Sequence, residues 1–414
     1  MAEIIKRPRG TVDWFYQDNE ILNNIKLQLV KESKKYGFDF VDVPLYEESS
    51  LFHRSVGESS DIVTKETFDL INKGDKNYTL RPEFTACINR AVIENKYYSL
   101  PSLPLKYSYF GKVFRYERPQ KGRYREFHQF GVEIFDENID LYSQIDSIML
   151  AISSCKKILG DIKITAKINF LGSFESRELY KKQLASYFAD KISFMCEDCK
   201  RRIVTNPLRI LDCKNEDDKK IIATAPKITD YLTEADKEEY NSIKNALDLL
   251  NVEYIEDDSL VRGLDYYTGF IYELYSPSNV GAIAGGGKYS SLMKSLGGPD
   301  FEGIGFSIGI ERLILSLSDE DKKKFLNEEH LDTFIIDLDK KGKGLILANT
   351  LRNYSLSVSF PSFSRSLNGA LKMADRSLAK YVIIIENDEY KLKDMTSREQ
   401  ITLSFDEIIN KLVR

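Results

Sequence analysis

The sequence predicts an α+β fold in which hairpin-forming strands carry a helical insertion and a small α/β domain follows. Residues 105–135 alternate as one long hairpin, and residues 170–250 are mostly helical, acidic and rich in lysine. After residue 330, strand and helix patterns alternate, as in a domain with its own core. We expect a first domain at 1–325 and a second at 330–414.

The elements of the first domain follow from apolar periodicity and from turn residues. Helical spacing covers 18–36 and ends near Gly37, whereas 38–47 alternates like a strand that stops at Pro44. The remaining segments predicted here are a hairpin at 67–83 turning at Lys73-Gly74-Asp75, helices at 86–94 and 139–158, strands at 252–275 and 281–286, and a helix from about Gly309.

The second domain shows the same two periods in short segments. Strand patterns occupy 333–338, 355–360 and 380–386, and helical patterns occupy 344–353, 367–377 and 406–413.

Composition indicates a protein without a membrane span. Hydrophobic residues make up 42% of the 414 residues and charged residues 30%, and no run of 18 apolar residues occurs. The N-terminus lacks the apolar segment of a secretory signal, so we expect a cytoplasmic location. Five cysteines are too few for a disulfide framework in a chain of this length.

Charge does not point to a general nucleic-acid binder. The net charge is −5, so any affinity for RNA must come from local patches. Residues 332–414 carry 13 Lys+Arg against 11 Asp+Glu, which leaves a weak positive bias at the C-terminal end.

The second strand of the long hairpin carries polar side chains on one face. Alternation places Gln129, Gly131 and Glu133 on one face of the strand, where residues two positions apart lie roughly 6–7 Å from each other. Such a pair suits an ammonium group and an imidazole nitrogen, although a solvated polar face gives the same pattern. Gly131 favours a ligand, because a missing side chain on a sheet face marks a close approach.

Arginines gather at the tip of the same hairpin. Arg115 ends its first strand, and Arg118, Arg123 and Arg125 follow with Lys121. Guanidinium groups bind phosphate oxygens in pairs and stay charged, so this tip suits a nucleotide triphosphate. A solvated basic turn is the plain alternative.

Further charged residues lie in otherwise apolar segments. LVRGLDYYTG at 260–269 predicts a strand in which Arg262 is costly to bury unless it is paired or faces an anion. Arg312 lies near the start of a predicted helix, where phosphates bind well. Glu83 follows Arg81. We expect Arg81 either to fix the local direction of the chain or to form an ion pair with an acidic side chain. Residues 285–287 are three glycines, which permit close approach or a bend.

No metal site is predicted. The histidines have no metal-ligand spacing. Cys196, Cys199 and Cys213 are residues of a type that binds zinc, but the sequence shows no evident fourth ligand near them. Cysteine is also common as a small buried residue.

Together these segments resemble the histidyl-tRNA synthetases, which are class II aminoacyl-tRNA synthetases. The most specific elements are RGLDYYTG and AIAGGGKYSSL, whereas the arginine hairpin is shared across the class. The matching segments are RPRGTVDW at 7–14, VGESSDIVTKETF at 56–68, LRPEFTA at 80–86, FRYERPQKGRYREFHQFGVEIF at 114–135, NPLRILDCK at 206–214, LVRGLDYYTG at 260–269, AIAGGGKYSSL at 282–292 and GFSIGIERL at 305–313.

The resemblance implies an antiparallel catalytic sheet, a helical insertion and a C-terminal anticodon-binding domain. It implies a homodimeric ligase that forms histidyl-adenylate from ATP and L-histidine, releases pyrophosphate, and charges tRNA(His) with release of AMP. Mg²⁺ is expected on the β- and γ-phosphates.

The resemblance also implies roles for single positions. Catalysis falls to Arg262, Arg115 and Gln129, and ATP binding to Arg115, Glu117, Arg123 and Arg312. Histidine binding falls to Glu83, Phe84, Thr85, Arg115, Gln129, Glu133, Arg262, Tyr266, Tyr267 and Tyr289. The tRNA acceptor end meets Gln120 and Arg125.

Two segments depart from the family pattern beside expected pocket residues. Phe84 replaces a glycine, and Lys288, Ser290 and Ser291 stand where the family commonly has Arg, Asp and Gly. Lysine keeps the charge of arginine but loses its fork.

Two other functions fit parts of the chain. The regulatory subunit of ATP phosphoribosyltransferase shares the catalytic fold, but it generally lacks the C-terminal domain and the full set of arginines. Here Arg115, Arg262 and Arg312 are all present. A class II synthetase for another amino acid is disfavoured by the RGLDYYTG and AIAGGGKYSSL elements.

Overall fold

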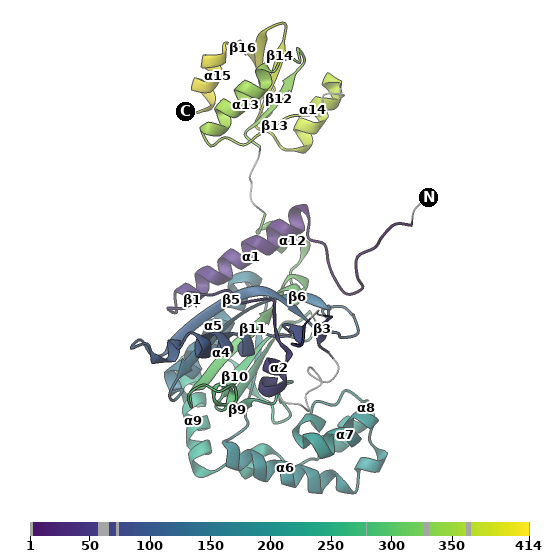
Figure 1. Cartoon of the computed structure of the whole chain (residues 1–414), viewed down its shortest axis with the longest axis vertical. Coiled ribbons are helices and arrows are strands. Elements are labelled where there is room, and N and C mark those ends of the chain that lie inside the picture. The colour runs from purple at the N-terminus through teal and green to yellow at the C-terminus, as the bar shows by residue number, and fades with distance from the viewer. Residues whose placement is uncertain are drawn as a thin grey trace. The chain divides into compact units, whose positions relative to one another are not determined.

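The computed structural model describes residues 3–56, 66–71, 74–278, 280–326, 331–361 and 366–413. The chain divides into two compact units, Met1–Leu326 and Asn327–Arg414, each with its own core (Figure 1). Most of the VGESSDIVTKETF motif, Lys73 of the predicted turn, and His330 lie outside the described residues.

An eight-stranded sheet forms the centre of the first unit. Adjacent strands are antiparallel except at the two edge pairs, β1 with β5 and β7 with β8, which are parallel. The predicted α+β fold is confirmed. In spatial order the strands are β1 (Asp39–Phe40), β5 (Leu105–Phe114), β6 (Glu126–Asp136), β11 (Glu302–Gly309), β10 (Ala282–Tyr289), β9 (Tyr267–Tyr275), β7 (Thr165–Phe170) and β8 (Tyr254–Glu256).

Helices α1 (Tyr16–Lys34) and α5 (Leu141–Leu159) pack on one face of this sheet. Helix α5 begins at the cap Asp140, whose side chain accepts a hydrogen bond from the Ser143 N–H, and it ends at Gly160 with φ 61°. Phe130, Val132 and Ile134 of β6 are fully buried against these helices. Alternation therefore turns Gln129 and Glu133 to the opposite face.

A three-stranded sheet, in the order β2-β4-β3, stands beside the main sheet. The prediction of a single strand at 38–47 is wrong, because this segment is divided between β1 and β2. Pro44 has no N–H for a ladder, and the carbonyls of Val43 and Pro44 accept hydrogen bonds from Arg81 instead. The elements here are β2 (Tyr46–Glu48), α2 (Ser49–Val56), β3 (Phe68–Leu70), β4 (Tyr78–Leu80) and α4 (Thr85–Glu94).

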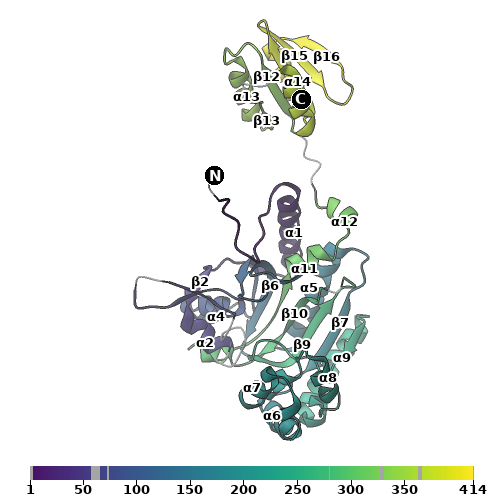
Figure 2. The ribbon, with the colours of Figure 1, turned by 90° about the vertical axis from the view of Figure 1, so that its right-hand side faces the viewer.

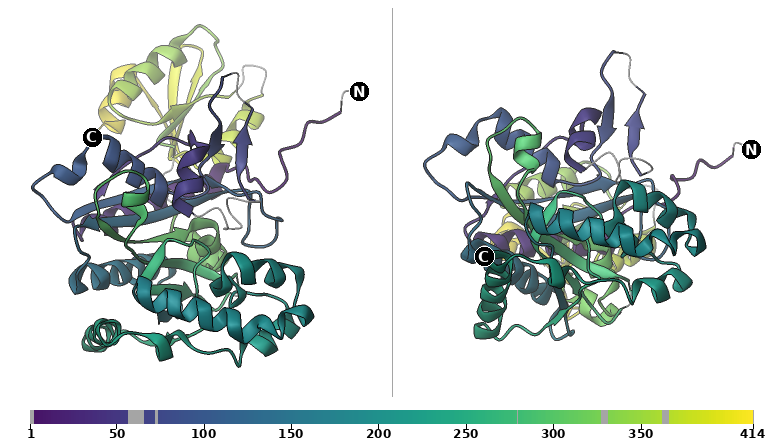
Figure 3. Two further views of the ribbon diagram at one scale, coloured as in Figure 1. Left: turned by 60° about the horizontal axis from the view of Figure 1, so that its bottom comes forward. Right: turned by 90° about the horizontal axis from the view of Figure 1, so that it is seen from below.

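The insertion is a group of helices at one end of the first unit (Figures 2 and 3). Tyr180, Leu184 and Phe188 are buried along one side of its longest helix, α6, in the same core cluster as Leu208 and Ile210. The helices are α6 (Phe174–Ala189), α7 (Glu197–Thr205), α8 (Glu216–Ile222) and α9 (Glu234–Leu249), with 3-10 turns at Ile192–Phe194, Pro207–Ile210 and Ile228–Tyr231.

The prediction that 260–269 forms a strand is wrong for its first seven residues. Strand β9 begins at Tyr267, and the segment before it is irregular. The Asn169 side chain donates to the Leu260 carbonyl at 2.9 Å, so this backbone bonds to a side chain rather than to a ladder. Arg262 therefore extends from a loop.

Short helices complete the first unit: η1 (Tyr97–Ser99), α10 (Leu292–Ser295), α11 (Ile310–Leu315) and α12 (Asp319–Lys323).

The second unit is a five-stranded mixed sheet in the order β13-β12-β14-β15-β16. Alternation along β14 sends Ile383 and Ile385 to the core cluster that holds residues of α13 and α15, and Val382 and Ile384 to that of α14. None of the described helices is long and apolar enough to cross a membrane. The elements are β12 (Thr333–Asp337), α13 (Lys343–Asn353), β13 (Val358–Ser359), α14 (Leu367–Arg376), β14 (Tyr381–Glu386), β15 (Glu389–Asp394), β16 (Gln400–Leu403) and α15 (Phe405–Leu412).

Candidate active site

A cavity of about 960 Å³ lies on the sheet face that carries Gln129 and Glu133. Residues from distant parts of the first unit form its walls, including the hairpin tip, the loop before β9, the start of α11 and the insertion. The predicted site residues that line it are Glu83, Phe84, Thr85, Arg115, Glu117, Gln120, Arg123, Gln129, Glu133, Arg262, Tyr266, Tyr267 and Arg312. Tyr289 and Arg125 are not among the lining residues.

Glu133 forms the acidic end of the cavity together with Glu83. The Thr85 hydroxyl donates to Glu133 Oε1 at 2.6 Å, and the Tyr289 hydroxyl donates to Oε2 at 2.7 Å. Tyr289 thus stands behind Glu133 rather than at the wall. Burial raises the pKa of Glu133 to about 8, although both hydrogen bonds favour the ionised form.

Glu83 is held by the first turn of α4. Its two carboxylate oxygens accept from the N–H groups of Thr85 at 2.6 Å and Ala86 at 2.8 Å, where the helix dipole favours negative charge. Burial nevertheless raises the pKa of the Glu83 carboxyl above its ordinary value. Because both oxygens already have partners, Glu83 fixes the position of Thr85.

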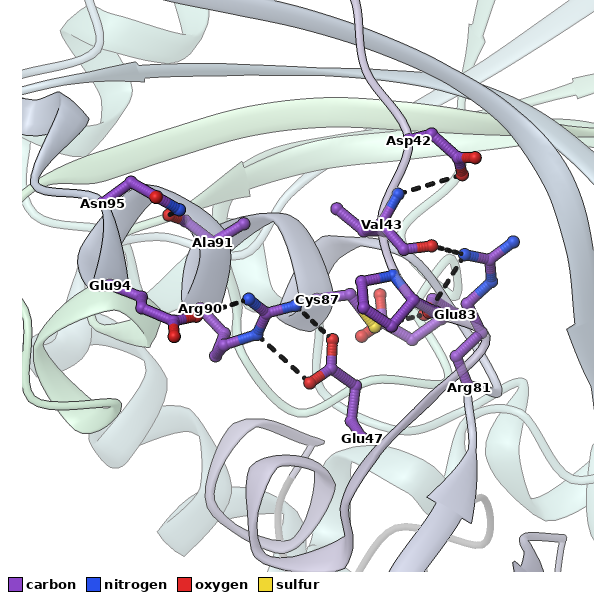
Figure 4. Close-up of polar contacts among 11 residues, drawn as sticks. Asp42, Val43, Glu47, Arg81, Glu83, Cys87, Arg90, Ala91, Glu94 and Asn95 are labelled. Carbon is purple, nitrogen blue, oxygen red and sulfur yellow. Dashed lines mark hydrogen bonds and ion pairs between the residues drawn. The ribbon is translucent and has the colours of Figure 1, made fainter.

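Arg81 anchors the segment that leads into Glu83 (Figure 4). Its guanidinium donates to the carbonyls of Val43 at 2.6 Å, Pro44 at 3.1 Å and Lys112 at 2.8 Å. Pairing with an acid, which the sequence left open, is wrong for the described residues.

The Phe84 departure has a packing explanation. Its ring is stacked on Tyr109 with centroids 4.2 Å apart, and the Arg81 guanidinium lies 3.9 Å from the Phe84 centroid. The backbone φ of −99° needs no glycine. Phe84 therefore fills a buried space at the cavity wall without distorting Thr85.

Three arginines form the cationic end. Arg115 donates through Nε to the Pro82 carbonyl at 2.9 Å, and Arg312 donates to the carbonyls of Gly122 at 2.8 Å and Ala282 at 2.7 Å. The third member, Arg123, lies 3.5 Å from Glu117.

Glu117 offsets part of the charge of Arg123, but no ion pair within the described residues offsets the charges of Arg115 and Arg312. Among the described residues, neither Arg115 nor Arg312 has a carboxylate within 4.0 Å. Burial and the nearby Arg123 and Arg115 guanidinium groups lower the pKa of Arg312, although it remains charged. A surplus of fixed positive charge in a cavity attracts an anion.

Arg262 reaches the cavity from the loop before β9. Its Nη1 forms an ion pair with Glu273 of β9, and its guanidinium lies 5.5 Å from the Tyr267 ring centroid. A Cβ at Gly285 would collide with this guanidinium, so Gly285 provides space for a side chain. Arg262 lines the same cavity as Arg115 despite its internal partner.

The interpretation of Gly131 as a ligand contact is wrong. A Cβ there would collide with the Tyr109 hydroxyl from β5, so the neighbouring strand fills the space. Glycine is required instead at Gly305 opposite Glu133, because a Cβ would strike the Glu133 carboxylate and the Val132 carbonyl.

The two residues expected at the tRNA acceptor end take different positions. Gln120 pairs with Arg123 through backbone hydrogen bonds and lines the cavity. The Arg125 guanidinium lies 3.9 Å from the Tyr116 ring centroid, and its backbone N–H donates to the Gly10 carbonyl at 2.8 Å. The segment at 7–14 thereby braces the hairpin tip.

The Lys288 and Ser290 departures lie away from the cavity wall. Lys288 pairs with Glu302 at 3.0 Å and with Glu239 at 3.6 Å. The Thr268 hydroxyl donates to the Ser290 hydroxyl at 3.3 Å.

Glu273 and Glu311 also line the cavity, although neither was predicted from the sequence. Glu311 accepts from the backbone N–H of His128 at 3.0 Å and contacts the His128 ring at 2.9 Å, which ties α11 to β6. A lone acid inside FIYELY was the available signal for Glu273, since an apolar strand rarely carries an unpaired charge.

Comparisons with known proteins agree with this architecture. A sequence model described as Histidyl-tRNA synthetase matches residues 10–313. The histidine--tRNA ligase of Staphylococcus carnosus (strain TM300) is 40% identical over 422 residues, which cover 98% of this chain and 97% of that protein.

Two solved structures also resemble this chain. The apo histidyl-tRNA synthetase of Staphylococcus aureus matches with a TM-score of 0.80 and 33% identity, covering 99% of this chain and 100% of that one. A Bacillus halodurans protein described as an ATP phosphoribosyltransferase regulatory subunit/histidyl-tRNA synthetase has a TM-score of 0.63 at 20% identity, covering 93% and 99%, which shows a shared fold alone. The chain belongs to the histidyl-tRNA synthetase family.

Proposed function

We propose that this enzyme activates L-histidine with ATP and transfers the histidyl group to tRNA(His). The observation that carries the proposal is one cavity with opposite charges at its two ends. Glu133 and Glu83 lie at the acidic end, and Arg115, Arg123 and Arg312 lie at the cationic end. An amino acid and a nucleotide triphosphate supply the complementary charges.

Histidine binds at the acidic end. The Glu133 carboxylate accepts an N–H of the substrate, and Gln129 on the same strand face binds a second polar group. The Tyr266 hydroxyl supports this arrangement, because it is buried and has no partner of ordinary hydrogen-bond geometry among the described residues. A buried hydroxyl of this kind favours the binding of a polar ligand that can form a hydrogen bond with it.

ATP binds along the cationic end. Arg115 and Arg262 hold the α-phosphate and the histidine carboxylate, while Arg123 and Arg312 hold the phosphates that leave. Ion pairing with Glu273 fixes the orientation of Arg262 before substrate arrives.

Glu117 fits a role in holding Mg²⁺. It lines the cavity, and magnesium binds through one or two carboxylates together with substrate phosphates. The bound ion would supply further neutralisation of phosphate charge.

The chemistry has two displacement steps. A histidine carboxylate oxygen bonds to the α-phosphorus while the bond to pyrophosphate breaks, which gives histidyl-adenylate. The 3′-terminal ribose hydroxyl of tRNA(His) then attacks the histidyl carbonyl and releases AMP. Positioning and charge stabilisation account for such catalysis, and Arg115 and Arg262 stabilise the charge that develops on the phosphoryl oxygens.

Assembly and location complete the proposal. We infer a homodimer, as the family resemblance implies, and a cytoplasmic location, which the five free cysteines support. The second unit binds the anticodon. A chain ending at residue 326 keeps histidine-dependent exchange but loses charging of tRNA(His); retained charging would contradict this role.

ATP–pyrophosphate exchange with each of the twenty amino acids tests the function. We expect exchange with histidine and background with the others, followed by charging of tRNA(His) transcript. Exchange with a different amino acid would indicate another synthetase. Absence of exchange with every amino acid would favour a regulatory role like that of the ATP phosphoribosyltransferase subunit.

A further inference from the structure

Four potential metal ligands converge in the insertion, outside the reaction described above. The ligand atoms of Cys196, Cys199, Cys213 and Asp218 all lie within 4.8 Å of one another. Cys196 is the cap of α7 and Cys199 lies in its first turn, whereas Cys213 follows the Pro207–Ile210 turn and Asp218 lies in α8. Three separate segments therefore meet at one point.

Distances within this cluster match those of a tetrahedral ion. The sulfurs of Cys196 and Cys213 are 3.7 Å apart, and the Cys213 sulfur lies 3.2 Å from Asp218 Oδ2. Zinc–sulfur bonds of about 2.3 Å in a tetrahedral site place two sulfurs about 3.8 Å apart. All three cysteines are free, so their sulfurs are available as metal ligands.

Asp218 is the residue that distinguishes this cluster from simple core packing. Its side chain is buried, and it has no cationic side chain within ion-pair distance among the described residues. The carboxylate accepts from the Cys196 N–H at 3.1 Å and otherwise faces sulfur. A buried carboxylate without a cation is costly, and a divalent ion removes that cost.

We propose that Cys196, Cys199, Cys213 and Asp218 bind one structural zinc ion. Three thiolates and a carboxylate are ligands that suit Zn²⁺, and four protein ligands leave no open position for catalysis. The spacing, two residues between the first cysteines and then thirteen and four, suits a closed site made from short helices. The proposal does not rest on the reaction assigned to the cavity.

The ion would brace part of the cavity wall. Cys196 and Cys213 line the cavity, as do their neighbours Asp198 and Lys214. Helices α7 and α8 have nine and seven residues, which is too short for stability without tertiary contacts. A shared ion joins both helices to the turn at Cys213.

Metal analysis of the full-length protein tests this site. Protein purified without a metal-chelating tag, then incubated with Zn²⁺ and desalted, should hold about one zinc per chain by mass spectrometry. Cys199→Ser and Asp218→Asn should each reduce this content several-fold. Cys155→Ala is the matched control, since Cys155 is buried in α5 outside the cluster, and it should retain zinc.

Two readouts are independent of activity. Cobalt(II) should give the visible absorption of a tetrahedral thiolate site in the wild type and the control only. A chelator should lower the melting temperature of those two proteins but not that of Cys199→Ser. Zinc content below one tenth per chain, full zinc content in both ligand variants, or a mass lower by two hydrogens from a Cys196–Cys213 disulfide would each overturn the proposal.

Discussion

At the acidic end of the cavity, Glu133 and Glu83 accept hydrogen bonds from neutral groups, whereas at the cationic end Arg115 and Arg312 donate to neutral carbonyls. Within the described residues, the pairing of Arg123 with Glu117 is the ion pair recorded at either end, and the two ends respond differently to burial. A carboxyl group can take up a proton, and the raised pKa of Glu133 shows this response. Guanidinium groups stay charged, so the cationic end keeps its field.

The largest effect is expected at the cationic end. Arg312→Ala removes a fixed charge and should lower kcat/KM for ATP–pyrophosphate exchange about a hundredfold or more. The measurement is exchange with histidine at varied ATP. Arg118→Ala is the matched control, because Arg118 is exposed in the same hairpin and does not line the cavity. Equal losses of kcat/KM in the two variants would mean that the effect comes from general surface charge and not from the cavity.

The acidic end should affect histidine alone. Glu133→Gln keeps the shape of the side chain but removes the charged acceptor, and such hydrogen bonds are worth about 1.5–3 kcal/mol. The KM for histidine should therefore rise about 10- to 100-fold while the KM for ATP stays constant. A matching rise in the KM for ATP would erase the functional distinction between the two ends.

The pH dependence sharpens the same distinction. Free Glu133 is protonated below a pH of about 8, and a cationic ligand stabilises its ionised form, so binding releases a proton there. Histidine affinity should rise with pH up to about 8, by at most about tenfold per pH unit, and then level off. Dividing wild-type by Glu133→Gln values removes the titration of histidine itself. A flat ratio between pH 6.5 and 8.5 would contradict the raised pKa.

The smallest effect is expected at the Lys288 departure. Lys288→Arg restores the residue common in the family, but position 288 pairs with Glu302 and Glu239 outside the cavity wall. Exchange kinetics should change less than about twofold, because arginine keeps the positive charge that pairs with Glu302 and Glu239. A larger change in the KM for histidine would show that position 288 couples to the acidic end.

Local periodicity predicted what depends on a single strand or helix. The hairpin, the shared face of Gln129 and Glu133, and most helix positions follow from spacing in the chain. Arg262 was misplaced in a strand because Leu260 and Val261 are apolar, while the bond from Asn169 that holds this loop is 91 residues distant.

Local periodicity does not predict the contacts between neighbouring strands or between distant segments of the chain. Tyr109 fills the space at Gly131 only because β5 and β6 pair in one register. Asp218 joins the three cysteines from an acidic run, Glu216 to Asp218, in which nothing in the sequence marks one member as buried. Tertiary structure decides these positions.

The positive charges of Arg115 and Arg312, which donate to carbonyl oxygens, also affect the enzyme between turnovers. Their mutual repulsion disfavours the folded protein when no polyphosphate is bound, whereas a ligand at a hundred times its Kd stabilises the folded protein by about 2.7 kcal/mol through mass action. Bound ATP thus stabilises the folded enzyme in addition to serving as its substrate. A cell depleted of ATP would hold this protein in its most heat-sensitive form.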